Sequence, residues 1–287
     1  DYSSVPEQVL MSNQSKVSQE INDAYFTKDE SALFCQSALD KHGWLGGSIL
    51  EPCVGGGSLV SGLSNVTALD INDYGYPLNF KMDFFDYQTS DRYDLVFTNP
   101  PFGRAGSVAG KILNHATNFS DRVAFILPQS FRKISLIDRI NPWFHPVSDL
   151  DLPTESYVLP DGSERVVRTC FQMWERRDYE RQRFNKTPYT EFFSRVGKTD
   201  GEYAFRTQGS SAGKILKGID HTPASTAFLV GGRELVEEHD WTSIARFSAG
   251  IPAIGLHDVA WGLRSDNIDN YLKHGIMSNM IDHNKDK

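Results

Sequence analysis

The chain has 287 residues, of which 39% are hydrophobic and 12% aromatic, enough for a full core in one large domain with a small extension. The formal net charge is −8, which argues against a passive nucleic-acid coat, because such proteins are usually basic. No apolar run approaches the roughly 20 residues that cross a bilayer, and no signal-peptide pattern opens the chain. We therefore expect no membrane partner.

The cysteines point to a reducing compartment. Cys35, Cys53 and Cys170 are odd in number and widely spaced. Such a set suits neither a disulfide framework nor a zinc site. We expect a cytoplasmic protein without a metal.

The first elements in chain order are a polar tail, 1–20, which we expect to be flexible, and a helix over Thr27–His42. Thr27 and Glu30 stand in capping-box positions at the start of that helix. Short apolar runs then alternate with helical pieces. The predicted strands are Ser48–Leu50, Val66–Leu69, Leu95–Phe97, Val123–Leu127 and Phe171–Trp174, and the predicted helices between them are Leu59–Leu63 and Lys111–Phe119.

This alternation predicts βαβ units and a parallel sheet covered on both faces. Four prolines predict that Pro142–Pro160 is mainly loop, with room for one short strand near Val147–Leu150. After Trp174 the pattern changes to the short strand-like runs Phe192–Val196, Tyr203–Thr207 and Ser225–Val230, and the end of the chain from Asp266 is polar. We divide the chain into the tail 1–20, a cofactor-binding catalytic domain 21–177 and a small substrate-contacting extension 178–287.

A glycine-rich loop, Glu51–Gly57 (EPCVGGG), follows the first strand at the sheet edge where ligands bind in α/β folds. Asp70 ends the next strand and can accept hydrogen bonds from both hydroxyls of a ribose, or simply cap a turn. Asp83, near the end of the third strand, can accept one from an exocyclic amine. No phosphate motif accompanies them, since Gly209–Ile215 is one residue short of a P-loop. Acceptors for a ribose and an adenine, without a phosphate motif, predict a nucleoside cofactor that carries no phosphates, which indicates S-adenosyl-L-methionine.

Residues 94–103, DLVFTNPPFG, end a core strand in a rigid corner. Pro100 and Pro101 fix φ and remove two backbone donors. The side-chain oxygen of Asn99 and the carbonyl of Pro100 are then two acceptors suited to one –NH₂ group. Phe102 offers a flat ring on which a base can stack, worth about 1–3 kcal/mol. The stretch predicts a pocket for an amine on an aromatic base.

These motifs resemble those of a known family. Asn-Pro-Pro-Phe at Asn99–Phe102 is similar to the (Asp/Asn)-Pro-Pro-(Tyr/Phe/Trp) motif of S-adenosylmethionine-dependent amino-methyltransferases, mainly adenine-N6 enzymes. The loop Glu51–Gly57 resembles their glycine-rich first motif, and Tyr25–Ala32 resembles the element that precedes it in the γ-type order. The resemblance spans about Tyr25–Arg177. It implies a Rossmann-like class I methyltransferase fold, with a mixed seven-stranded sheet, a late antiparallel strand and a small C-terminal α+β extension.

The resemblance also implies the roles of the site residues. Asn99, Pro100, Pro101 and Phe102 would form the catalytic corner, which orients the target amine and stacks on the extruded base. The residues implied in binding S-adenosyl-L-methionine are Tyr25, Phe26, Thr27, Glu51, Pro52, Gly55, Gly57, Asp70, Ile71, Asp83, Phe84 and Asn99. The expected reaction is methyl transfer to the N6 amine of adenine, in a base flipped from the duplex or already single-stranded.

The sequence indicates the substrate polymer less clearly than it indicates the reaction. Phe102, the local basic clusters and the extra C-terminal unit favour nucleic acid, with DNA favoured over RNA, and predict a site-specific DNA (adenine-N6) methyltransferase. An RNA adenosine-N6 enzyme, a protein-glutamine methyltransferase and an inactive nucleic-acid-binding partner are the alternatives. The residues expected to contact nucleic acid are Arg104, Arg132, Lys133 and Lys214. The loop that ends at Lys214 is equally readable as a plain surface loop.

Overall fold

The structure is a computed structural model that describes residues 26–153, 156–158, 162–185, 187–221, 223–248 and 251–282. The predicted tail, 1–20, and the predicted cofactor residue Tyr25 lie outside the described residues.

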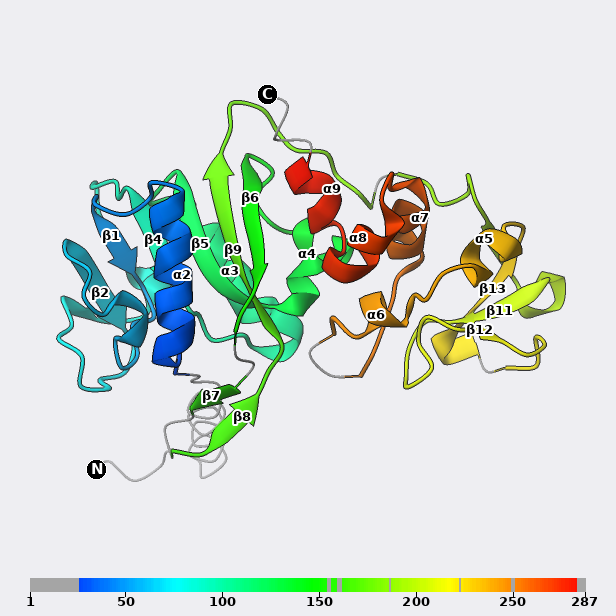
Figure 1. Ribbon diagram of the computed structural model, residues 1–287, viewed down its shortest axis with the longest axis horizontal. Coiled ribbons are helices and arrows are strands. Elements are labelled where there is room, and N and C mark those ends of the chain that lie inside the picture. The colour runs from blue at the N-terminus through cyan, green and yellow to red at the C-terminus, as the bar shows by residue number, and fades with distance from the viewer. Residues whose placement is uncertain are drawn as a thin grey trace, which may run out of the picture.

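Seven strands form one mixed sheet. Their bounds are β1 Ile49–Glu51, β2 Val66–Asp70, β3 Phe80–Lys81, β4 Leu95–Thr98, β5 Arg122–Pro128, β6 Phe144–Asp151 and β9 Thr169–Arg176. They lie in the order β3-β2-β1-β4-β5-β9-β6 (Figure 1). Strands β1 to β5 pair in parallel, whereas β9 runs antiparallel to both β5 and β6. This arrangement confirms the predicted fold class, a Rossmann-like mixed sheet of seven strands with one late antiparallel strand.

The order of the strands places a switch point beside β1, whose neighbours β2 and β4 belong to opposite halves of the sheet. Ligands of open α/β sheets bind at such a point, beyond the carboxyl ends of the strands. Every residue of β1 and β4 is buried, as expected for strands that are covered on both faces.

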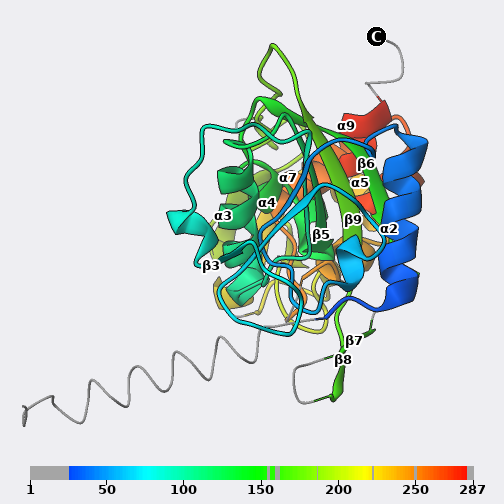
Figure 2. The same ribbon diagram turned by 90° about the vertical axis from the view of Figure 1, so that its left-hand side faces the viewer.

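Helices cover the two faces of the sheet. Figure 2 shows α2 (Asp29–Lys41) on one side of the strands and α3 (Ser107–Ala116) on the other. Helix α2 confirms the first predicted helix, but its N-cap is Lys28 and no side chain caps it, so the predicted capping box is not formed. None of the helices in the described ranges is long and apolar enough to cross a bilayer.

Two predictions about this part of the chain are wrong. The helix expected at Leu59–Leu63 is a single 3-10 turn, Ser58–Val60. The segment Pro142–Pro160, expected to be mainly loop with one short strand near Val147–Leu150, contains the eight-residue strand β6, so the strand is present but about twice as long as predicted. Strand β6 lies at the edge of the sheet, where proline is tolerated, and its pairing with β9 shifts register between Pro146 and Ser148.

The chain continues into a second, four-stranded sheet. It consists of β10 Ser194–Val196, β11 Tyr203–Arg206, β12 Ile215–Leu216 and β13 Thr226–Val230, in the order β10-β13-β11-β12. A small hairpin, β7 (Ser156–Val158) with β8 (Glu164–Val166), joins β6 to β9. The five helices that follow β13 are α5 Arg233–Glu237, α6 Thr242–Ala245, α7 Leu256–Arg264, α8 Ile268–His274 and α9 Met277–Asp282.

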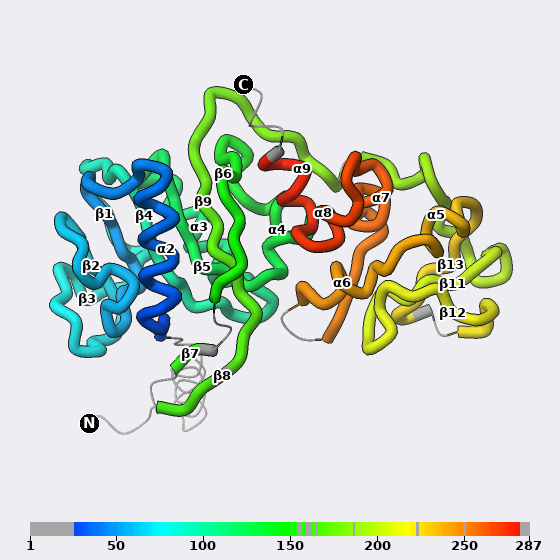
Figure 3. Tube along the Cα trace, in the orientation of Figure 1, coloured from blue at the N-terminus to red at the C-terminus, as the bar shows by residue number. Residues whose placement is uncertain are grey.

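The last helices return toward the first sheet, so that α8 and α9 lie near α4 (Ile134–Ile137) and β6, as the trace in Figure 3 shows. The stretch from Asp266, polar in the sequence, folds into these two helices. It buries Tyr271, Ile276 and Met277. These apolar side chains are part of the hydrophobic core, so their burial stabilises the docking of the last helices.

Arg132 and Lys133 form this joint between the first sheet and the C-terminal helices. Arg132 is 1% exposed, its Nε lies 2.8 Å from Asp149 and its Nη1 lies 2.7 Å from Asp151. The ammonium of Lys133 donates hydrogen bonds to the hydroxyl of Ser248 and to a backbone carbonyl of the same segment. The prediction that these two residues contact phosphates is wrong, because both charged groups are buried and bound within the protein.

The pair of Arg132 with Asp149 gives a test of this joint. Asp149→Ala leaves a buried guanidinium without one of its carboxylates, and we expect a loss of about 3–5 kcal/mol in the free energy of unfolding. The matched control is Asp121→Ala, which breaks an exposed pair with Arg92 and should cost at most about 1 kcal/mol. Urea unfolding of the three proteins measures both values. Equal losses in the two variants would contradict the assignment.

Candidate active site

The loop after β1 makes a bend that requires glycine. Gly55 has φ 53° and Gly57 has φ 83°, in the left-handed region. A Cβ on Gly57 would overlap the ring of Tyr76, and one on Gly55 would lie 3.2 Å from the ring of Phe26. The backbone conformation and the close approach of two rings therefore both exclude larger residues.

Asp70, at the end of β2, holds this bend in place. Its Oδ2 accepts a hydrogen bond from the amide of Gly55 at 2.9 Å, and its Oδ1 accepts one from the amide of Asn72 at 2.9 Å. Burial raises the pKa of Asp70, although these backbone donors oppose the shift. The carboxylate keeps further acceptor sites, so the predicted ribose contact stays a prediction, while the contact with Gly55 is an additional role that the spacing in the sequence did not reveal.

Glu51 is the most unusual group of the site. Its side chain is 1% exposed, and its Oε1 accepts a hydrogen bond from the amide of Cys53 at 3.0 Å. Among the described residues, nothing donates a hydrogen bond to its Oε2. Burial raises the pKa of Glu51 to about 8 and the charge of Asp70 adds to the shift, while the nearby hydroxyl of Thr98 and the amide of Cys53 oppose it. A cation placed beside Oε2 would offset the effects of burial and of Asp70.

A small cavity brings three segments of the chain together. Its lining residues are Phe26, Thr27, Glu51, Cys53, Val54, Gly55, Gly56, Gly57, Ser58, Leu59 and Asn99. The structure thus brings together six predicted cofactor residues, among them Asn99, whose Nδ2 donates a hydrogen bond to the hydroxyl of Thr27 at 3.0 Å. Cys53, Val54, Gly56, Ser58 and Leu59 were not predicted as cofactor residues, although their places within and just after the loop were the available signal.

The cavity is narrow. Its volume is about 30 Å³, far below the roughly 300–1,000 Å³ of typical small-molecule sites. A ligand of cofactor size must therefore extend along the outside of the glycine bend or displace a side chain such as Phe26. Gly56 at the tip of the bend is exposed, and a Cβ built on it would meet nothing within 4 Å, so the outside of the bend is open.

The prediction that Phe102 presents an open face is wrong for this structure. Its side chain is 6% exposed, and the ring of Tyr157 lies edge-on to it with centroids 6.3 Å apart. Tyr157 belongs to the β7–β8 hairpin, and its neighbour Val158 forms a bridge with Phe26. The hairpin therefore covers the corner that Pro100 and Pro101 begin.

The residues predicted at the adenine end do not line the cavity. Asp83 accepts a hydrogen bond from the amide of Phe85 and caps a 3-10 turn, so it has a local structural role. Phe84 is buried against His115 and Phe119, because its ring completes the core beneath α3. Ile71 is 54% exposed, directly after Asp70, and remains available to a ligand on the outside of the bend. Pro52 is buried at the start of the bend.

Two predicted nucleic-acid contacts are accessible. Arg104 is exposed in a 3-10 turn, Arg104–Gly106, just after the corner, and Lys214 is exposed before β12. Both contacts stay predictions. In the described part of the chain, no group of three or more His, Cys, Asp or Glu side chains is placed to hold a metal ion.

No protein-family model matches the chain, and no curated protein matches it. Among solved structures it is similar to a protein of Pyrococcus horikoshii provisionally described as an RNA methyltransferase (TM-score 0.43, 17% identity, 53% of this chain and 86% of that one). It is also similar to the modification subunit of a provisionally described type I restriction enzyme from Vibrio vulnificus (TM-score 0.39, 15% identity, 59% of this chain and 49% of that one). A third similar structure is magnesium protoporphyrin IX methyltransferase from Synechocystis, with bound S-adenosylmethionine (TM-score 0.37, 14% identity, 51% of this chain and 79% of that one). At these identities the likeness concerns the fold and not the substrate.

Glu51 predicts a specific dependence of stability on pH. The pKa of a glutamate in an unfolded chain is about 4.3, whereas the pKa of Glu51 in the folded protein is about 8. The folded state therefore holds a proton that the unfolded chain releases, so the contribution of Glu51 to stability is complete below pH ~4.3 and is lost as the pH rises toward 8.

Glu51→Gln removes this titration while it keeps the size and the hydrogen-bonding oxygen of the side chain. Urea unfolding at several pH values between about 5 and 8 should show that the wild type becomes progressively less stable relative to the variant as the pH rises. Parallel pH curves for the two proteins would mean that Glu51 is ionised throughout this range.

Proposed function

We propose that the chain is an S-adenosyl-L-methionine-dependent methyltransferase that transfers a methyl group to the N6 amine of adenine in nucleic acid, with DNA favoured over RNA. The observation that carries the proposal is that Glu51 and Asn99, at the ends of neighbouring strands, line one cavity with the glycine bend. A polar corner suited to an amine thus stands beside a bend suited to a nucleoside.

The donor set fits this cofactor. The methionine end of S-adenosyl-L-methionine carries an ammonium group, and the buried Oε2 of Glu51, without a donor among the described residues, is the acceptor that such a cation needs. None of the described residues that line the cavity is Lys or Arg. A cofactor with phosphates would bring negative charge toward Glu51 with no counter-charge from the lining, so a phosphate-free nucleoside is favoured.

The same contacts assign roles to the residues of the chain. Glu51 would hold the methionine end, the open face of Gly56 would accept the nucleoside, and Asp70 would hold the bend and reach the ribose. When bound, the cofactor supplies an electrophilic methyl group. The amide oxygen of Asn99 and the carbonyl of Pro100 would accept the two hydrogens of the target amine.

These two acceptors would favour transfer in a defined way. The lone pair of an aromatic amine is delocalised into the ring, and hydrogen bonds from both N–H groups favour the tetrahedral nitrogen that attacks. They also stabilise the positive charge that develops on that nitrogen, and Pro100 with Pro101 keeps the acceptors in a fixed geometry. Stacking of the base on Phe102 requires Tyr157 to move away, because its ring now covers that side.

Asn99→Ala tests the proposed role of the corner. We expect methyl transfer from labelled cofactor to DNA to fall by at least about 10²-fold, the usual effect of losing one preorganised hydrogen-bonding group. Cofactor binding, measured by calorimetry, should stay within about twofold, because Glu51 and the bend are untouched.

The control is Asn118→Ala, an exposed asparagine outside the cavity, which should leave both quantities unchanged. Normal transfer by the Asn99 variant, or equal loss of transfer and of cofactor binding, would contradict the role of Asn99 in orienting the amine.

A further inference from the structure

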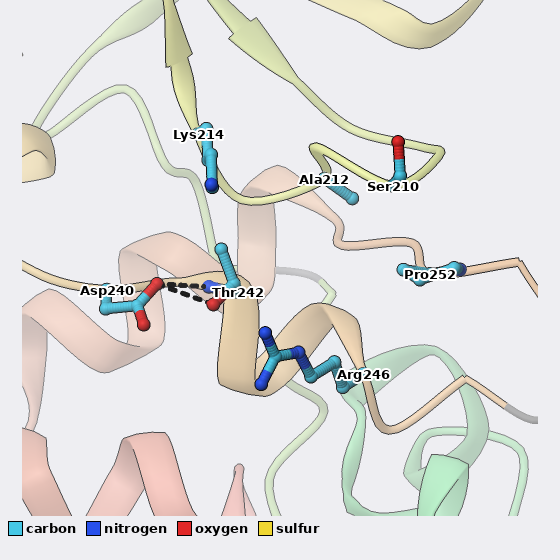
Figure 4. A pocket seen from close by; sticks show the side chains of 7 residues that line it. All are labelled: Ser210, Ala212, Lys214, Asp240, Thr242, Arg246 and Pro252. Atoms are coloured by element: carbon cyan, nitrogen blue, oxygen red, sulfur yellow. Dashed lines mark hydrogen bonds between the residues drawn. The ribbon is translucent and has the colours of Figure 1, made fainter.

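A second cavity, with a volume of about 380 Å³, lies in the C-terminal part of the chain. Its walls come from the turn between β11 and β12, from the start and end of α6, and from the segment that precedes α7. The lining residues are Ser210, Ala212, Lys214, Asp240, Thr242, Arg246 and Pro252 (Figure 4). None of them lines the candidate active site.

The walls are tied to one another by the backbone. Gly213 has φ 91°, and a Cβ built on it would lie 2.6 Å from the carbonyl carbon of Trp241, so only glycine lets the turn pack against the start of α6. On the other side, the amide of Gly209 donates to the carbonyl of Pro252 at 2.9 Å. The cavity is therefore a built feature of the fold, and the GSSAGK stretch, Gly209–Lys214, is required for its shape.

Two cations face this space. Figure 4 shows Lys214 reaching in from the β12 wall and Arg246 from the opposite wall, on α6. Both side chains are exposed, and within the described ranges neither charged group makes a hydrogen bond or an ion pair. Cations held on opposite walls of one cavity attract an anion between them.

Asp240 lowers the net positive charge of the cavity and so determines the charge of the anion that it favours. Its Oδ1 accepts hydrogen bonds from the amide of Thr242 at 3.0 Å and from its hydroxyl at 2.7 Å. These hydrogen bonds, with smaller effects of Arg246 and Lys214, hold the pKa of Asp240 below its ordinary value. The carboxylate is thus ionised at neutral pH, and with the two cations it leaves the cavity one net positive charge.

We propose that this cavity binds a phosphodiester group of the nucleic-acid substrate, with Lys214 and Arg246 on either side of the phosphate. One net positive charge matches the single charge of a phosphodiester, whereas the second charge of a terminal phosphate would be repelled by Asp240. The volume lies in the range of small-molecule sites, so the phosphate can enter with its sugar. The identification of the polymer rests on the proposed function.

The position of the cavity suits this role. In Figure 1, α6 lies between the first sheet and the second, four-stranded sheet, so the cavity that α6 lines stands between the predicted catalytic domain and the strands of the predicted substrate-contacting extension. Sequence analysis pointed to Lys214 but not to Arg246, which is 32 residues further along the chain.

The test is binding of a fluorescent single-stranded DNA 20-mer, measured by anisotropy over a range of salt concentrations without cofactor. The variant Lys214→Met with Arg246→Met should bind about tenfold more weakly near 0.15 M salt, and its salt slope should fall by about 1.4, as expected for two lost phosphate contacts. The control is Lys217→Met with Arg195→Met, which removes two exposed cations of the same unit outside the cavity and should bind like the wild type.

A third variant, Asp240→Asn, keeps the oxygen that binds Thr242 and removes the negative charge, so it should bind the 20-mer more tightly than the wild type. AMP serves as the probe for a free phosphomonoester. Loss of AMP binding in the Lys214 and Arg246 variant, with unchanged 20-mer binding, would assign the cavity to a free nucleotide and overturn the proposal.

Equal 20-mer affinity of the wild type, the cavity variant and the control, including no binding by any of them, would also overturn it. The methyl-transfer assay reports on the proposed function separately. Methyl transfer to nucleic acid by the wild type, together with unchanged 20-mer binding by the cavity variant, would contradict only the proposed phosphate site. Weaker 20-mer binding by the cavity variant, without methyl transfer by the wild type, would contradict only the proposed methyltransferase activity.

Discussion

The burial of Glu51 at the end of β1 is the constraint on which the site depends. A carboxyl group with one oxygen lacking a donor among the described residues is costly inside a protein, and its raised pKa expresses that cost. The sheet order surrounds it with β2, which brings Asp70 to the bend, and β4, which brings Asn99 to the same cavity. A bound cation would satisfy the group, so the cost is best understood as part of a binding site.

The central strands could be predicted from the sequence because each is a short apolar run that is buried on both faces. Strand β6 was predicted only as a short strand near Val147–Leu150, because Pro146 argues against a longer one, and only its place at the sheet edge, known from the structure, makes proline acceptable there. The last two helices were missed because their few buried side chains, such as Tyr271, are scattered through a polar stretch. Burial of that kind depends on packing against distant elements, α8 against α7 and α9 against β6, which local sequence does not encode.

The site was predictable where one short motif carries the geometry, as at the glycine bend and the corner that begins with Asn99. It was not predictable where function depends on partners far along the chain. Arg132 follows a strand on the expected side, but Asp149 and Asp151 bury its charge. Phe102 has the expected place in the corner, but the hairpin with Tyr157 covers it. Exposure results from the whole fold, and a single sequence gives little information about it.

We propose that an amine on a nucleic-acid base is methylated at the corner formed by Asn99 and Pro100, and the most direct measurement of this identifies the labelled polymer. The protein is incubated with S-adenosyl-L-methionine labelled on its methyl group and with DNA, RNA and protein, each of which is then separated and counted. The labelled polymer is digested to nucleosides. We expect the label in DNA, where it should elute as N6-methyladenine nucleoside. Label in protein alone, or in no polymer, would contradict the proposal.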